Sequence, residues 1–107
     1  MSDAARILLT TVGDRANAER LARSLVEERL AACVNLLPGV RSIYRWEGAV
    51  EEADEILLVV KTTRAAHAAL AERVRALHPY ELPELVSLDP AEVDPAYLRW
   101  IAKSVTG

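Results

Sequence analysis

The stretch from Leu30 to Thr63 constrains the fold of this chain more than any other. It contains apolar, β-branched and aromatic segments that are interrupted only by short turn signals and an acidic stretch. The extended segments run over 32–37, 40–46 and 56–60, with Pro38-Gly39 and Glu47-Gly48 between them. Such residues bounded by Pro and Gly indicate strands and hairpins. We therefore predict two long strand segments folded back on each other as a ribbon.

The rest of the chain supplies elements that would attach to this ribbon. They are a strand over Arg6–Val12, a helix with Asp14 as N-cap, a helix over Arg64–Leu77 with Thr63 as N-cap, a short strand over Leu85–Leu88 and a helix over Ala96–Val105 preceded by the cap Asp94. The order β-α-β-β-α-β plus a C-terminal helix is the split-βαβ, ferredoxin-like arrangement of an α+β fold. Right-handed crossovers would place 6–12 and 56–60 at the centre of the sheet and both preceding helices on one face.

Both faces of the predicted central strands are apolar. Ile56, Leu58 and Val60 point one way, and Leu57 and Val59 point the other way, because strands alternate faces. Two helices cover only one face, so the second face would be a contiguous apolar patch of the kind that marks interaction sites. We infer that another copy of the chain covers it. The alternative is that the last helix or the ribbon folds over this face within one subunit.

Length, charge and cysteine count exclude several classes of protein. A chain of 107 residues fits a single domain, 1–107, and a net charge of −3 without a basic block argues against nucleic-acid binding. No apolar run is long enough to span a bilayer, and the first residues lack the pattern of a signal peptide. One cysteine cannot form an internal disulfide, which suits a reducing compartment. We therefore expect a cytoplasmic protein that binds neither nucleic acid nor membrane.

Three residues carry side chains that could bind a metal ion. Cys33 lies in an apolar strand, His78 stands at a predicted helix end, and Glu81 follows it across a proline. The simpler interpretations are a small buried hydrophobic side chain for Cys33 and a helix stop for His78. No histidine pair at metal spacing and no CxxC occurs, which argues against a closed zinc site in one chain. If the three residues converged, for example across a subunit interface, copper or zinc would suit them.

A second set of residues could hold an anion. Arg41 and Arg45 share one face of the ribbon and Trp46 lies on the other, while Lys61 ends the aliphatic strand 56–60. In a cleft between subunits, these residues could bind a small anionic ligand; the simpler interpretation of Lys61 is an amine that reaches solvent. A small enzyme that uses Lys61, Tyr80 and Glu81 as acid–base groups is a further alternative, but the chain has no Gly-rich phosphate loop and no nucleophile elbow, and we predict that it is not an enzyme.

Three long motifs, LAACVNLLPGVRSIYRWEG, EILLVVKTT and HPYELPE, occur in this order and resemble the CutA divalent-ion-tolerance family over nearly the whole chain. The resemblance implies a ferredoxin-like fold and a tight homotrimer similar in architecture to the PII signal-transduction proteins. It also implies a cytoplasmic bacterial protein linked to tolerance of copper and other divalent cations. The residues that match characteristic family positions are Cys33, Trp46, Lys61, His78, Tyr80 and Glu81.

Two functional hypotheses follow. In the first, the homotrimer takes part in divalent-cation tolerance and binds Cu(II) or another divalent cation through Cys33, His78 and Glu81, with no cofactor required. In the second, it is a PII-like module that binds a small anionic ligand between subunits and signals to a protein partner, which the sequence does not identify. The candidate residues for that cleft are Arg41, Arg45, Trp46, Lys61 and Tyr80.

Overall fold

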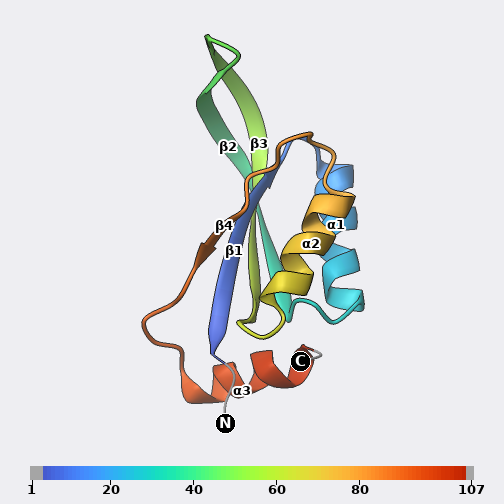
Figure 1. The fold of residues 1–107 in the computed structure, drawn as a ribbon, viewed down its shortest axis with the longest axis vertical. Helices are drawn as coiled ribbons and strands as arrows, with labels where there is room; N and C mark the ends of the chain where they lie inside the picture. Colours follow the sequence, from blue (N-terminus) through green and yellow to red (C-terminus); the bar gives the residue numbers. More distant parts are fainter. Residues whose placement is uncertain (1–3, 106–107) are drawn as a thin grey trace.

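The computed structural model describes residues 4–105, which form four strands and three helices (Figure 1). In chain order these are β1 (Ala5–Val12), α1 (Arg15–Glu27), β2 (Cys33–Trp46), β3 (Ala49–Thr63), α2 (His67–Leu77), β4 (Val86–Leu88) and α3 (Pro95–Ser104). The order matches the predicted split-βαβ arrangement with an added C-terminal helix.

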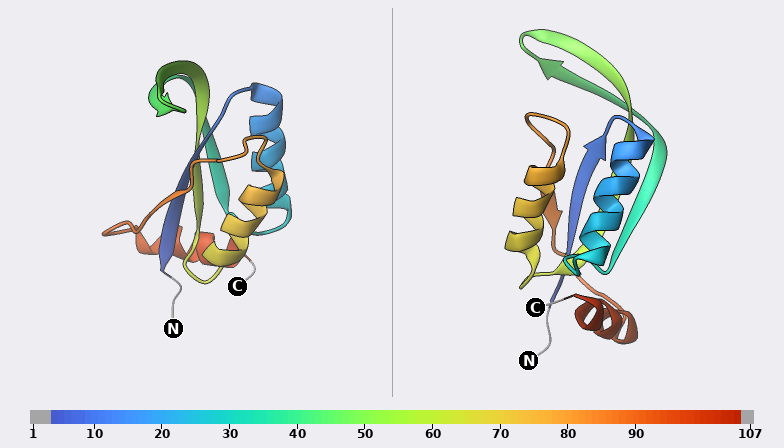
Figure 2. Two further views of the ribbon diagram at one scale, coloured as in Figure 1. Left: turned by 45° about the horizontal axis from the view of Figure 1, so that its top comes forward. Right: turned by 90° about the vertical axis from the view of Figure 1, so that its right-hand side faces the viewer.

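The four strands form one sheet in the order β2-β3-β1-β4, and every neighbouring pair is antiparallel. The predicted central position of the first and third strands is therefore confirmed. Helices α1 and α2 lie side by side on one face of this sheet, and α3 lies beneath one end of it (Figures 1 and 2).

An aliphatic core joins the sheet to α1 and α2. From β1 and β3 it receives Leu8 and Leu58, and from the two helices it receives Leu25 and Leu70, all with 0% of their surface exposed. Burying a leucine side chain contributes about 1.5–3 kcal/mol, so aliphatic residues alone suffice to form this core in a chain without phenylalanine.

Helix α1 begins as its sequence predicts. Asp14 has an extended backbone, and its carboxylate accepts a hydrogen bond from the Asn17 backbone N–H at 3.0 Å. This satisfies one of the amide groups that a helix N-terminus leaves without a partner.

The predicted start of the second helix is wrong by three residues. The Thr63 hydroxyl accepts a hydrogen bond from the Ala66 N–H at 3.2 Å, as a cap would, but it initiates a turn. Residues 64–66 form this turn, and the Arg64 N–H donates to the Ala4 carbonyl at 2.9 Å, which prolongs the sheet beyond β3. Helix α2 therefore begins only at His67, without a side-chain cap.

The ribbon formed by β2 and β3 is longer than predicted. Pro38-Gly39 does not divide β2: the strand continues through a register shift between Leu37 and Val40, and Gly39 takes a φ of +82° there. The acidic stretch before 56–60, which the sequence left outside the predicted strand, belongs to β3. Glu47 and Gly48, with φ of 48° and 83°, form the hairpin turn. The ribbon extends past the end of the sheet, and the molecule measures 47 Å along its longest axis (Figure 1).

The last two elements lie close to their predicted positions. Strand β4 is one residue shorter than expected, and α3 begins one residue earlier, at Pro95. The Asp94 carboxylate accepts hydrogen bonds from the backbone of Ala96 and Tyr97 at 3.1 and 3.2 Å, so it caps the helix as predicted.

Candidate functional site

The sheet face opposite α1 and α2 carries an unpartnered apolar surface. We call it the open face; the register places on it Ile7 and Leu9 of β1, Leu57 and Val59 of β3, and Val86 and Leu88 of β4. Val86 and Leu88 are 46% and 48% exposed. Helix α3 packs beneath one end of the sheet and reaches only the end of this face, at Ile7 and Lys61, and the ribbon extends past the other end, so Val86 and Leu88 stay exposed (Figures 1 and 2).

The structure does not bring the three predicted metal ligands together within one chain. Cys33 stands opposite Lys61 in the β2–β3 register, whereas His78 contacts Thr11, which stands opposite Leu57. Four residues separate these positions along the strand direction, so they lie at least about 13 Å apart. Among residues 4–105, no three His, Cys, Asp or Glu side chains are grouped as a metal site.

His78 is held by hydrogen bonds at both ring nitrogens. It is the C-cap of α2, its Nε2 donates to the Thr11 carbonyl at 2.9 Å, and its Nδ1 accepts the Tyr80 backbone N–H at 3.0 Å. Burial lowers the pKa of His78, and this favours the neutral ring that such bonding requires. A metal ion could bind His78 only after one of these bonds breaks. Glu81 is exposed.

Tyr80 belongs to a small network at the base of the ribbon. Its hydroxyl donates to Glu55 Oε2 at 2.8 Å, and Glu55 is only 9% exposed. Burial, followed by the hydrogen bond to Glu55, raises the pKa of Tyr80 well above its ordinary value. Burial and the charge of Glu55 also raise the pKa of Glu84. A Cβ atom at Gly13 would lie 2.8 Å from the Tyr80 hydroxyl, so only glycine leaves room for this contact.

The predicted anion-binding residues are also spread over the chain. Arg41 donates to Asp54 at 3.0 Å and to Glu52 at 2.9 Å across the ribbon, so its charge is already paired. Trp46 is 43% exposed near the ribbon tip. Asp54 precedes Lys61 by seven residues of strand, or about 23 Å, so one chain does not unite Arg41 with Lys61.

Lys61 instead lies beside Tyr97, which is not among the site residues predicted from the sequence. Its Nζ is 3.4 Å from the Tyr97 hydroxyl and 5.6 Å from the centre of the Tyr97 ring. The two residues border a cavity of about 160 Å³ between the sheet and α3. Nothing in the local sequence around Tyr97 marks this contact, because Tyr97 is 36 positions away from Lys61.

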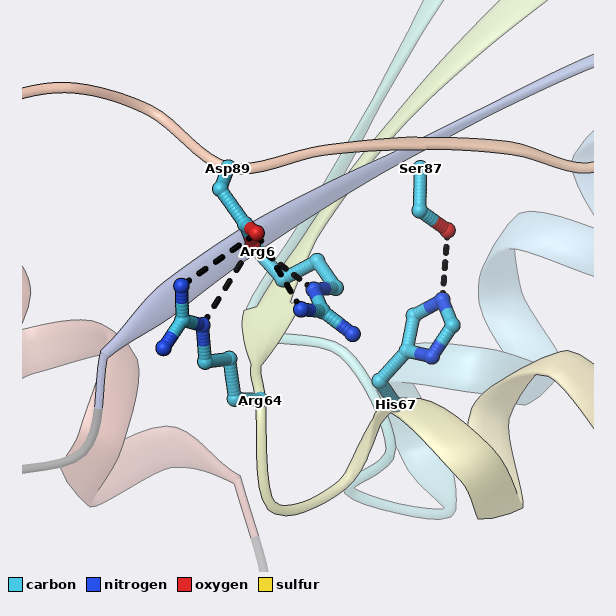
Figure 3. Close-up of polar contacts among 5 residues, drawn as sticks. All are labelled: Arg6, Arg64, His67, Ser87 and Asp89. Atoms are coloured by element: carbon cyan, nitrogen blue, oxygen red, sulfur yellow. Dashed lines mark hydrogen bonds and ion pairs between the residues drawn. The ribbon is translucent and has the colours of Figure 1, made fainter.

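A second polar cluster lies where β4 meets β1 and the start of α2 (Figure 3). The Asp89 carboxylate accepts hydrogen bonds from Arg6 at 2.8 and 3.2 Å and from Arg64 at 3.2 and 3.5 Å. The Arg6 and Arg64 guanidinium groups lower the pKa of Asp89 to about 2. His67 Nε2 lies 2.5 Å from the Ser87 hydroxyl. These contacts attach the short strand β4 to the sheet and to α2.

Together these features define a class of protein: a ferredoxin-like α+β fold with a long ribbon, an open apolar sheet face and, among residues 4–105, no group of three metal-ligating side chains. No helix within these residues has the length and apolar character needed to cross a bilayer.

Residues 6–104 match the family described as CutA1 divalent ion tolerance protein. The chain belongs to this family.

Individual relatives agree with this assignment. The divalent-cation tolerance protein CutA of Thermus thermophilus is 53% identical over 98 residues, which are 92% of this chain and 95% of that protein. The mouse protein CutA is 48% identical over 84 residues, or 78% of this chain, but the match spans only 48% of the mouse protein.

Solved structures of this family have the same fold. The T. thermophilus divalent cation tolerance protein superposes with a TM-score of 0.92 at 51% identity, covering 95% of this chain and 99% of that one. Rice CutA1 gives a TM-score of 0.94 at 38% identity, with 98% and 96% of the two chains covered. The fold predicted from the sequence is therefore that of the family.

Proposed function

We propose that this chain works as a cytoplasmic homotrimer in the tolerance of divalent cations, copper among them. The open face is the observation that carries the proposal, because Val86 and Leu88 are about half exposed and adjoin further apolar side chains of β1 and β3. Large apolar patches are rare on monomers. The long edge strand β2 adds unpaired backbone groups that another copy can bond. Family resemblance implies three copies.

Association would also determine where a cation binds. Cys33 is half-buried on the open face, opposite Lys61, so its thiol would face a neighbouring copy. A thiolate suits copper, and a second ligand for the same ion would have to come from another subunit. Glu81 is exposed and free to reach a neighbour, whereas His78 would first lose a hydrogen bond. The proposal assigns the chain no catalytic step.

Light scattering combined with size exclusion at low micromolar concentration tests the assembly. We expect about three times the chain mass of 11.8 kDa. A Val86→Asp variant, which places a charge on the open face, should dissociate. Val26→Asp is the matched control, because Val26 is 41% exposed on the helical side of the molecule. A wild-type protein with the mass of one chain would refute the proposal.

Calorimetric titration with Cu(II) and Zn(II) tests the ligands. We expect Cys33→Ala to weaken Cu(II) binding most, because the thiol is the softest ligand of the three candidates. Glu81→Ala and His78→Ala should weaken it less. Equal binding by the wild type and all three variants would exclude these residues as ligands, whatever the oligomeric state.

A second candidate function is a PII-like module that binds a small anion and signals to a protein partner. The observation that favours it is Lys61, which borders a cavity and makes no ion pair within residues 4–105. In an assembly, Arg45, Trp46 and Tyr80 of neighbouring copies could complete such a cleft. Thermal-shift measurements with nucleotides and carboxylates test it, because a ligand at 100 times its dissociation constant stabilises a protein by about 2.7 kcal/mol.

The cytoplasmic location is part of the proposal and does not hold throughout the family. Relatives in Arabidopsis and rice are named as chloroplastic, and the Archaeoglobus fulgidus structure is named as a periplasmic protein. Fractionation of the native host, followed by immunodetection of the chain, would test it; recovery in a membrane or exported fraction would contradict it.

A further inference from the structure

The cavity beside Lys61 lies wholly within one chain, between β1, the end of β3, the segment before α3 and α3 itself. Its apolar walls are Ala5, Ile7, Val93 and Ile101. It is partly open to solvent, and its volume of about 160 Å³ is close to that of an enclosed apolar protein cavity of about 150 Å³ that holds benzene. The cavity therefore has the volume and the surface for one compact hydrocarbon group.

The cations at this cavity differ in whether they are already paired. Arg6 donates from both Nε and Nη2 to Asp89, so its charge is compensated. Lys61 has no carboxylate within ion-pair distance among residues 4–105, and its polar neighbour is the Tyr97 hydroxyl at 3.4 Å. An ammonium group and a phenol O–H thus stand together at the edge of an apolar cavity.

We propose that this cavity binds a small monocarboxylate, with Lys61 and Tyr97 holding the carboxylate and the apolar walls holding a compact hydrocarbon group. One ammonium charge and one hydroxyl donor match the two oxygens of a single carboxylate. A phosphate dianion is disfavoured, because Glu92 also lines the cavity and the site lacks the paired guanidinium donors that phosphate prefers. The inference deepens the anion-binding alternative above by naming its ligand class.

Benzoate is the probe, because it combines a carboxylate with a group of benzene size. In calorimetric titration of the full chain, we expect a dissociation constant of about 1 mM or tighter, which is ordinary for a ligand of this size. Benzamide, which has the same shape without the charge, and acetate, which lacks the ring, should each bind about tenfold more weakly. Absence of benzoate binding, or equal binding of benzoate and benzamide, would overturn the proposal.

The chain contains only two lysines, and this provides a matched pair of variants. Lys61→Met should lower benzoate affinity by about tenfold and remove the preference over benzamide, while Lys103→Met on α3 should leave both unchanged. Tyr97→Phe deletes one hydroxyl without altering the cavity walls and should cost about threefold. If neither Lys61→Met nor Tyr97→Phe changes benzoate affinity, the assigned site is wrong.

Light scattering of each sample separates this inference from the proposed function. A monomeric wild type that still binds benzoate with the expected variant pattern would refute the trimer and support the cavity. A trimer that binds Cu(II) but not benzoate would do the reverse. Circular dichroism of Lys61→Met confirms folding before its affinity is interpreted.

Discussion

Thr10 carries a hydroxyl group in the interior that the fold does not satisfy. Its side chain lies between Leu8 and Val12 on the helix-covered face of β1, and 0% of the residue is exposed. Within residues 4–105, Thr10 Oγ1 is buried and has no hydrogen-bond partner. Burying such a group costs about 1–3 kcal/mol relative to a state in which water solvates it.

Replacing Thr10 by valine exchanges this hydroxyl for a methyl group of nearly the same size. We expect the free energy of unfolding to rise by about 1 kcal/mol, the lower end of the range, because the methyl group is slightly larger than the hydroxyl in a close-packed core. Valine also fits a strand at least as well as threonine does.

Thr62 provides a control of opposite sign. It lies on the same sheet face and is also 0% exposed, but its hydroxyl donates to the Leu30 carbonyl at 2.7 Å. Thr62→Val leaves that carbonyl without its partner and should lower the free energy of unfolding by about 1–3 kcal/mol. Urea unfolding of both variants and the wild type at one protein concentration measures the two effects. If Thr10→Val destabilises the protein as much as Thr62→Val does, the assignment of Thr10 as unsatisfied is wrong.

Three further effects can be measured. Gly13→Ala should destabilise the protein by about 1–3 kcal/mol, because the added Cβ would lie 2.8 Å from the Tyr80 hydroxyl. In urea unfolding, the same substitution in a Tyr80→Phe background should cost much less, and an equal cost in both backgrounds would contradict the clash. The folded-state pKa of Asp89 is depressed to about 2, so its ion pairs stabilise the fold above about pH 4 and that stability is lost as the pH falls toward 2. The difference in the free energy of unfolding between the wild type and Asp89→Asn should therefore shrink as the pH falls from about 4 to about 2. A difference that does not change with pH would refute this prediction. The pKa of His78 is also lowered in the folded protein, so the unfolded chain takes up the proton first and the free energy of unfolding should fall as the pH drops below about 6.5. His78→Gln should reduce this dependence on pH, and an equal dependence in the wild type and the variant would contradict the prediction.

The parts of the fold that depend only on residues adjacent in the sequence were predictable from the sequence. Asp14 and Asp94 cap their helices as expected, because a cap involves only the next three residues. The turn over 64–66 that delays the start of α2 was not predictable, because it is tied by a bond from Arg64 to Ala4, sixty positions earlier, and only the folded sheet brings them together. The acidic part of β3 lay outside the strand predicted over 56–60, because strand propensity is weak evidence where pairing with β2 decides the structure.

The candidate sites show the same limit more strongly. Tyr80 was selected from the sequence, but its partner Glu55, 25 positions away, was not, and neither was Tyr97 beside Lys61. The one signal for Glu55 is that it is the acid directly before the aliphatic run of β3, where the strand enters the core. Side-chain pairs of this kind depend on how elements pack, and periodicity along the chain does not contain that information.

The metal hypothesis depends on the assembly hypothesis for a geometric reason. A strand rises by about 3.3 Å per residue and cannot shorten, so Cys33 opposite Lys61 and His78 beside Thr11 remain at least about 13 Å apart in any folded monomer. A metal ion binds its ligands at about 2.0–2.3 Å, so one ion cannot contact both side chains across that separation. Only a second copy can bring Cys33 of one chain near Glu81 or His78 of another. A monomeric protein would therefore exclude this shared ligand set as well as the trimer, without any measurement of metal binding.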